Sequence, residues 1–288
     1  MPSTQENLAS KTPPGGELPP ERLCKLPVFR PVAVQLLSEL AREEPDTAQV
    51  VKLLHSDPAF SAEILTLANS ALYSRQTRTT TIQKAIMLVG LERTRALAVT
   101  VALQGMVRDT GNKAALQDCW GHSRATALVA EWLAPFYAIH KDQAYTAALM
   151  HDVGRLAMLS AYPEYPDFLA TVAGANSDLL EAEKRSFSVN HCEAGRLLTR
   201  IWGLPEEFWH TAAHHHEPVT GKPGDRIDLV RLSCLLAQSL DFKAAPQIEC
   251  EPAEALIARL PETKFPRSRA SIPELSEHLW KAMQADGG

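Results

Sequence analysis

Residues 147–155 read Ala-Ala-Leu-Met-His-Asp-Val-Gly-Arg, which places an imidazole and a carboxylate side by side in an otherwise apolar helical run. Burying either group without a partner would cost on the order of several kcal/mol. The stretch therefore predicts a cation, hydrogen-bond partners or a solvent-filled cleft at His151 and Asp152. Other histidines stand in separate segments around it, at His122, His191 and the run 214–216.

The remainder of the chain also has a helical pattern. Apolar residues recur every three or four positions, as at Val34, Leu37 and Leu40, which is the period of an amphipathic helix. Asp57 and Pro58 are suited to open a helix, because Asp accepts from free amides and Pro lacks a donor that would go unpaired. Alternating apolar and polar runs are missing, so we expect an all-α fold. The later helices are expected at 82–89, 92–103, 119–133, 141–159, 178–187, 191–202, 205–215, 226–240, 252–260 and 272–283.

The bulk composition limits the classes of function. A formal charge of −5 over 288 residues argues against nucleic acid or an anionic membrane surface as a partner. Five widely spaced cysteines without a Cys-x-x-Cys pair predict neither a disulfide framework nor a cysteine-rich zinc module, and they fit a reducing cytoplasm. No apolar run reaches the roughly 18 residues of a membrane helix, so we expect no membrane association.

The two ends of the chain differ from its middle. Residues 1–17 are rich in Ser, Thr, Pro and Gly and have neither a basic start nor an apolar core, so they are expected to form a disordered leader rather than a signal peptide. Residues 243–288 contain a Pro- and Arg-rich connector between two short helical patterns. We expect them to form a C-terminal helical tail.

The histidines and Asp152 have the composition of a metal site built from several helices. Zinc, manganese and iron bind neutral imidazole and ionised carboxylate, and a two-metal hydrolase uses about six or seven such ligands. The alternative is that each His is an ordinary surface or boundary residue, as expected for the pair His210 and His214. In the metal interpretation one carboxylate bridges two ions, with this assignment: Asp152 as the bridge, His122 and His151 on one ion, and His191, His215 and His216 on the other.

Several short motifs together resemble the HDOD domains, relatives of the HD phosphohydrolases. They are Leu26-Pro27, Ser56-Asp57-Pro58-Ala59, Leu-Ala-Asn-Ser-Ala-Leu-Tyr at 67–73, Ala-Ile-Met-Leu-Val-Gly-Leu at 85–91, the His151-Asp152 run, His-Cys-Glu-Ala-Gly at 191–195, Trp-Gly-Leu-Pro at 202–205 and His-His-Glu-Pro at 215–218. The resemblance spans 18–242. It implies an N-terminal helical lobe at 18–110 packed against an HD-like bundle at 111–242, and a regulatory or output role in bacterial signal transduction.

The chain departs from a working HD hydrolase at three places. Cys234 stands where those enzymes close the first metal site with Asp; its thiolate could hold zinc or iron, or it could be a buried, inert thiol. Arg155 stands where the related HD-GYP phosphodiesterases usually have Lys, and it could meet a phosphate bidentately. The Gly-Tyr-Pro signature of those enzymes is absent after His216.

Two functions remain open from the sequence. The incomplete metal set favours a regulatory module that binds a signalling protein or a small nucleotide-type ligand without turnover. The alternative is a metal-dependent phosphohydrolase or phosphodiesterase acting on a nucleotide or cyclic dinucleotide, with iron, manganese or zinc as cofactor.

Overall fold

The structure is a computed structural model that describes residues 20–26, 31–70, 79–108, 113–173, 178–245 and 250–285. These residues form helices and connecting segments without a β-strand, so the expected all-α fold is confirmed. The expected leader at 1–17 and the end of the 67–73 motif lie outside the described residues. Within the described ranges, no helix combines the length and the apolar character needed to cross a membrane.

The chain divides into two compact units. The N-terminal unit comprises Pro27–Asp109 with Trp202–Pro205, and the histidine unit comprises the remainder. The expected boundaries of lobe, bundle and tail stay predictions. The N-terminal unit contains α3 (Pro31–Leu40), α4 (Thr47–His55), α5 (Pro58–Ala68), α6 (Ile82–Val89) and α7 (Leu91–Arg108). The histidine unit contains α2 (Glu21–Cys24), α8 (Lys113–Tyr137), α9 (Lys141–Met150), α10 (Val153–Ala161), α11 (Tyr165–Ala173), α12 (Leu179–Phe187), α13 (His191–Ile201), α14 (Glu206–His214), α15 (Arg226–Ser239), α16 (Ala253–Ile257) and α17 (Ile272–Ala285).

The N-terminal unit follows from local signals in its sequence. The Asp57 carboxylate accepts from the amides of Ala59 and Phe60 at the start of α5, as expected. Leu36, Phe60 and Ile64 are fully buried, so the apolar faces of α3 and α5 form part of its core. This unit carries none of the predicted metal ligands.

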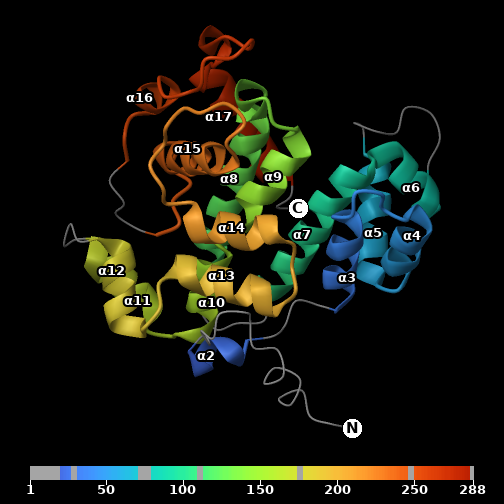
Figure 1. The fold of residues 1–288 in the computed structure, drawn as a ribbon, viewed down its shortest axis with the longest axis horizontal. Coiled ribbons are helices and arrows are strands. Elements are labelled where there is room, and N and C mark those ends of the chain that lie inside the picture. The colour runs from blue at the N-terminus through green and yellow to red at the C-terminus, as the bar shows by residue number, and fades with distance from the viewer. Residues whose placement is uncertain are drawn as a thin grey trace. The chain divides into compact units, whose positions relative to one another are not determined.

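The histidine unit is organised around α8. That long helix packs along α9 and α15, while α13 lies between α10 and α14 (Figure 1). The helices α8, α9, α10, α13 and α15 each bury an apolar face. All the predicted ligands lie on these helices or at their ends, except His215 and His216, which directly follow α14.

The helix expected over 141–159 is broken, which corrects the sequence prediction. α9 ends at Met150 and α10 begins at Val153, because Asp152 has a non-helical backbone with φ −104° and ψ 21°. The amide of His151 turns back to the carbonyl of Ala148 at 3.3 Å, a tighter turn than the α-helix makes. His151 and Asp152 therefore lie at a helix junction rather than on one helical face.

Helix α11 was not predicted from the sequence. Pro163 and Pro166 interrupt the apolar pattern there and read as helix breakers. Pro166 lies in the first turn of α11, where a missing amide donor costs little. The helix matters to the site because it carries the buried Tyr165.

Candidate metal centre

All the predicted site residues lie in the histidine unit. They lie on separate elements: His122 on α8, His151 and Asp152 between α9 and α10, Arg155 on α10, His191 at the start of α13, His215 and His216 directly after α14, and Cys234 on α15. All are buried except His216, which is half-buried.

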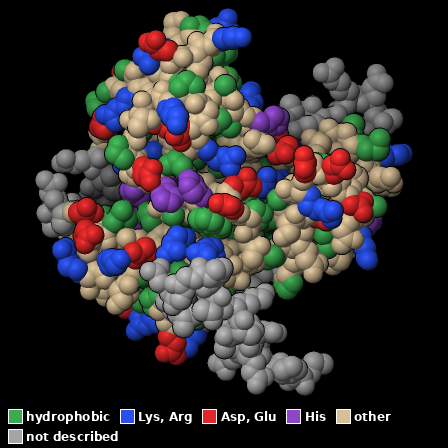
Figure 2. Space-filling view, viewed as in Figure 1, with side chains coloured by type: hydrophobic (Ala, Val, Ile, Leu, Met, Phe, Trp, Pro, Cys, Tyr) green, Lys and Arg blue, Asp and Glu red, His purple; other side chains and the backbone are tan. Residues whose placement is uncertain are grey.

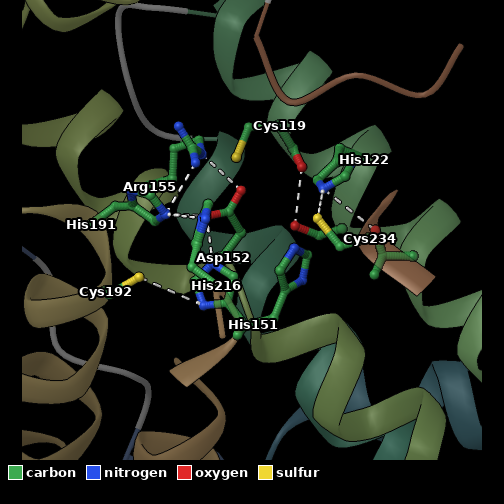
Figure 3. A network of polar contacts seen from close by, with 12 residues as sticks. Cys119, His122, His151, Asp152, Arg155, His191, Cys192, His216 and Cys234 are labelled. Atoms are coloured by element: carbon green, nitrogen blue, oxygen red, sulfur yellow. Dashed lines mark hydrogen bonds and ion pairs between the residues drawn. The ribbon is translucent and has the colours of Figure 1, made fainter. Parts of the chain in front are cut away.

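The seven predicted ligands form one continuous cluster. Their ligand atoms fall into groups whose members lie within 4.8 Å of one another. Figure 3 shows His122 and Cys234 on one side, Arg155 and His191 on the other, and Asp152 between them. The groups share His151 and His215 and are these: His122, His151 and Cys234; His151, Asp152 and His215; and His191, Cys192, His215 and His216.

A glycine contact brings the two sides of the cluster together. A Cβ added to Gly154 on α10 would lie 1.9 Å from the His191 carbonyl oxygen and 2.5 Å from the Gly195 amide nitrogen. Because Gly154 has no side chain, the first turn of α13 can approach the start of α10. This approach places Asp152 Oδ1 at 3.7 Å from His191 Nε2.

Four imidazoles are oriented by acceptors on their outer nitrogens. A carbonyl or carboxylate can only accept, so in each ring Nδ1 donates, and in a neutral ring Nε2 keeps its lone pair. This is the arrangement of metal-ligating histidines, whose other nitrogen is fixed by a hydrogen bond. The Nδ1 contacts are His122 to the Phe242 carbonyl (2.7 Å), His151 to the Ala148 carbonyl (2.6 Å), His215 to the Ala212 carbonyl (3.0 Å) and His191 to Glu183 Oε2 (2.7 Å).

Burial keeps His122, His151 and His215 neutral, whereas at His191 burial and the Arg155 charge are outweighed by the Glu183 carboxylate, which raises the pKa to about 10. Desolvation lowers the pKa of His151 to about 3 and holds the pKa of His215 well below its usual range. It also lowers the pKa of His122. At neutral pH these rings therefore offer lone pairs rather than positive charge.

Asp152 is ionised because of Arg155. Burial by itself would raise the pKa of Asp152, but the Arg155 guanidinium holds it well below its usual range. Arg155 Nε donates to Asp152 Oδ2 at 2.8 Å, and Nη2 lies 3.1 Å from His191 Nε2. Only 3% of Arg155 is exposed. Whether a phosphate binds this residue stays a prediction.

Cys234 contacts His122 at the other end of the cluster. Its Sγ lies 3.5 Å from His122 Nε2, and Gln238 Nε2 donates to the same sulfur at 3.6 Å. Burial raises the pKa of Cys234 to about 12. The protein alone therefore keeps it as a thiol, and a bound cation would be needed to make it a thiolate ligand.

Two residues of the cluster were missed from the sequence. Glu183 on α12 is fully buried and accepts from the His191 amide at 2.9 Å and from Tyr165 Oη at 2.5 Å. Its signal was a Glu in the apolar spacing of Leu179 and Phe187, one helical turn from each. Cys192 also belongs to the cluster, with its sulfur 3.9 Å from His215 Nδ1.

Histidines also reach the surface of the molecule (Figure 2). His210 is exposed, and its ring centroid lies 4.6 Å from that of His214, one turn later on α14. The expectation that this pair stays outside the buried cluster agrees with these positions. Its spacing still allows chelation of a metal added in solution.

The buried cluster fits at least one metal ion. Three of its ligand atoms are buried and have no hydrogen-bond partner, namely His151 Nε2, Asp152 Oδ1 and His215 Nε2. Two ligands bonded to one ion at about 2.1 Å lie roughly 3 to 4 Å apart, and Asp152 Oδ1 is 3.8 Å from His215 Nε2. A buried polar atom is normally paired, so three unpaired ones facing one another point to a cation.

The chain matches the sequence model of the HDOD domain over residues 26–218. It belongs to the HDOD family. A relative from Treponema pallidum (strain Nichols), an uncharacterised protein, is 29% identical over 184 residues, which are 61% of this chain. The chain spans about a third (35%) of the length of that relative.

Solved structures share the fold. An HDOD domain protein of unknown function from Geobacter sulfurreducens aligns with a TM-score of 0.68 and 22% identity, over 91% of this chain and 92% of that one. A protein from Marinobacter aquaeolei VT8, provisionally named a signal transduction protein, gives a TM-score of 0.67 and 18% identity over 98% and 62%. One from Shewanella amazonensis SB2B, provisionally named a metal-dependent phosphohydrolase, gives 0.61 and 21% over 90% and 92%. At these identities the likeness concerns the fold alone.

Proposed function

We propose that this HDOD protein is a regulatory module of a bacterial, cytoplasmic signalling system. It acts by binding a signalling protein or a small nucleotide-type ligand, and its histidine cluster stabilises the fold rather than hydrolysing a phosphate ester. The observation that carries the proposal is the burial of the cluster. His151, Asp152 and His215 are each at most 2% exposed, whereas a hydrolytic centre has to admit both substrate and water.

Cys234 supports the same conclusion. A two-metal hydrolase needs ionised carboxylates to hold its metal ions. The position expected to supply one of them holds a thiol with a raised pKa, Cys234. With Arg155 present, the cluster around Asp152 is therefore short of negative charge for two divalent ions.

The phosphohydrolase alternative has one specific observation in its favour. The unpaired atoms of His151, Asp152 and His215 fit an ion, and a divalent ion there would polarise a phosphoryl oxygen or activate water. In that case Asp152 would hold the ion, and the neighbouring imidazoles would complete its ligand set.

Phosphate release separates the two functions. Protein loaded with zinc, manganese or iron, with loading confirmed by elemental analysis, is incubated with nucleotides and cyclic dinucleotides. The Asp152→Asn variant is the matched control. We expect the wild type to release no more phosphate than the variant. A nucleotide that is the ligand of the module should raise the Tm of the protein without being hydrolysed. Turnover by the wild type that disappears in Asp152→Asn would overturn the proposal and establish the alternative.

A further inference from the structure

The part of the cluster around His191 contains a cation of the protein itself, the guanidinium of Arg155. Arg155 reaches from α10 to Asp152 Oδ2 and to His191 Nε2, at 2.8 and 3.1 Å. Its Nη1 lies 3.8 Å from Glu183 Oε1. A guanidinium carries only donors and keeps its charge. It thus bridges a carboxylate and an imidazole as a metal ion would, within a ring of groups that are all buried.

This contact excludes a metal from His191. In a neutral His191 ring the one lone pair of Nε2 faces the Arg155 guanidinium at 3.1 Å, and in a charged ring Nε2 carries a proton. In neither state does His191 offer a lone pair to a metal ion. His216 Nε2 lies 2.9 Å from His191 Nε2, so this pair needs either a proton on one nitrogen or a shared cation. Arg155 Nη2, at 3.1 Å from His191 Nε2, supplies positive charge next to this pair.

The two carboxylate oxygens of Asp152 also differ in their partners. Oδ2 accepts from Arg155. Oδ1 is buried, has no hydrogen-bond donor, and lies 3.8 Å from the equally unpaired Nε2 of His215. One oxygen of the bridging carboxylate is therefore satisfied by a side-chain cation, and the other is available for a metal ion.

We propose that Arg155 is a built-in cation that replaces the second metal ion. The centre then takes one divalent ion, held by His151 Nε2, Asp152 Oδ1 and His215 Nε2, while His191 and His216 bind no metal as long as Arg155 is present. The inference concerns only the number of ions. It applies equally to a regulatory module and to a hydrolase that uses one ion, so phosphate release does not decide it.

Metal stoichiometry tests the inference. All proteins carry His210→Ala, which removes the exposed pair on α14 as a second binding site. Each is stripped with chelator, dialysed against manganese or zinc, and analysed for bound metal. We expect one equivalent per chain with Arg155 intact, two in Arg155→Ala, and one again in the double variant Arg155→Ala/His191→Ala.

Two further variants separate charge from folding. Arg155→Lys keeps the cation and should keep one equivalent. Arg155→Gln is the substitute if circular dichroism shows that Arg155→Ala does not fold, and it should take two. Two equivalents with Arg155 intact, or no gain in a folded variant that lacks the charge, would overturn the inference.

Discussion

Asp152 and Asp228 are both buried carboxylates of the histidine unit, at 2% and 3% exposure, yet their surroundings differ. Asp228, in the first turn of α15, accepts from Tyr137 Oη at 2.6 Å, from Thr220 Oγ1 at 2.9 Å and from the Gly221 amide at 3.1 Å. Both of its oxygens are satisfied by neutral donors of the chain. Asp152 has one oxygen on Arg155 and one without a donor.

The difference separates a structural carboxylate from a candidate ligand. Burial alone does not distinguish the two carboxylates, since both are buried. The distinction lies in whether the chain itself uses every lone pair, because an unsatisfied buried acceptor costs about 1–3 kcal/mol unless a ligand completes it. Asp228 fixes the loop that follows His216 by binding Thr220 and Gly221, whereas one oxygen of Asp152 has no donor among the described residues.

The largest effect is expected from Gly154→Ala. The new Cβ would overlap the His191 carbonyl oxygen, so α10 and α13 must separate, at about 3 kcal/mol or more. Separation moves His191 away from Asp152 but leaves the contacts of Asp228 intact. Urea unfolding measures the loss, and elemental analysis should show impaired metal uptake.

Gly121→Ala is the matched control for that substitution. Gly121 lies on α8 with nothing within 4 Å of an added Cβ, so alanine should raise the free energy of unfolding by up to about 1 kcal/mol. Equal stability of the Gly154 and Gly121 variants would show that the close approach of α10 and α13 is not needed.

Asp228→Ala should destabilise the fold by about 2–3 kcal/mol, because it leaves the Tyr137 hydroxyl and the Gly221 amide without their acceptor. Tyr137→Phe, which removes one donor of several, should cost about 1 kcal/mol. Urea unfolding provides both values, and the folded Asp228 variant should bind metal as the wild type does. A loss of metal binding at wild-type stability would contradict the structural assignment of Asp228.

Acidification should weaken the metal-free protein through the histidines around Asp152. The folded pKa of His151 is depressed to about 3, so its contribution to stability is present above the unfolded pKa near 6.5 and is lost as the pH falls below it. Between pH 7.5 and pH 5 this one residue should cost about 2 kcal/mol. Urea unfolding in the presence of chelator, repeated across this pH range, measures how the free energy of unfolding changes with pH.

The dependence of the free energy of unfolding on pH should change in His151→Gln and stay unchanged in His210→Ala. His151→Gln removes the contribution of the buried ring and should make the curve flatter. His210→Ala, at an exposed position, should leave it as in the wild type. A slope that is unchanged in His151→Gln would mean that another group governs the acid response.

The helical fold and most of the candidate ligands could be predicted from the sequence. Amphipathic periodicity and the cap at Asp57 depend on residues a few positions apart, so they can be read locally, and they predicted α5 correctly. Metal-ligand chemistry likewise depends on residue type, which is why His151 and Asp152 could be named before their positions were known, whereas Cys234 could be named only through the resemblance to the HD enzymes. The break between α9 and α10 could not be predicted, because residues 141–159 keep a helical pattern throughout.

Which charged groups come into contact depends on the packing of distant segments. Arg155 and His191 are 36 positions apart, and Tyr137 and Asp228 are 91 apart. Their contacts follow from how α10 packs on α13 and α8 on α15. A sequence shows that a carboxylate must be paired if it is buried, but the partner is set by packing between distant segments. That packing distinguishes Asp152, which keeps one oxygen without a donor among the described residues, from Asp228, both of whose oxygens have donors.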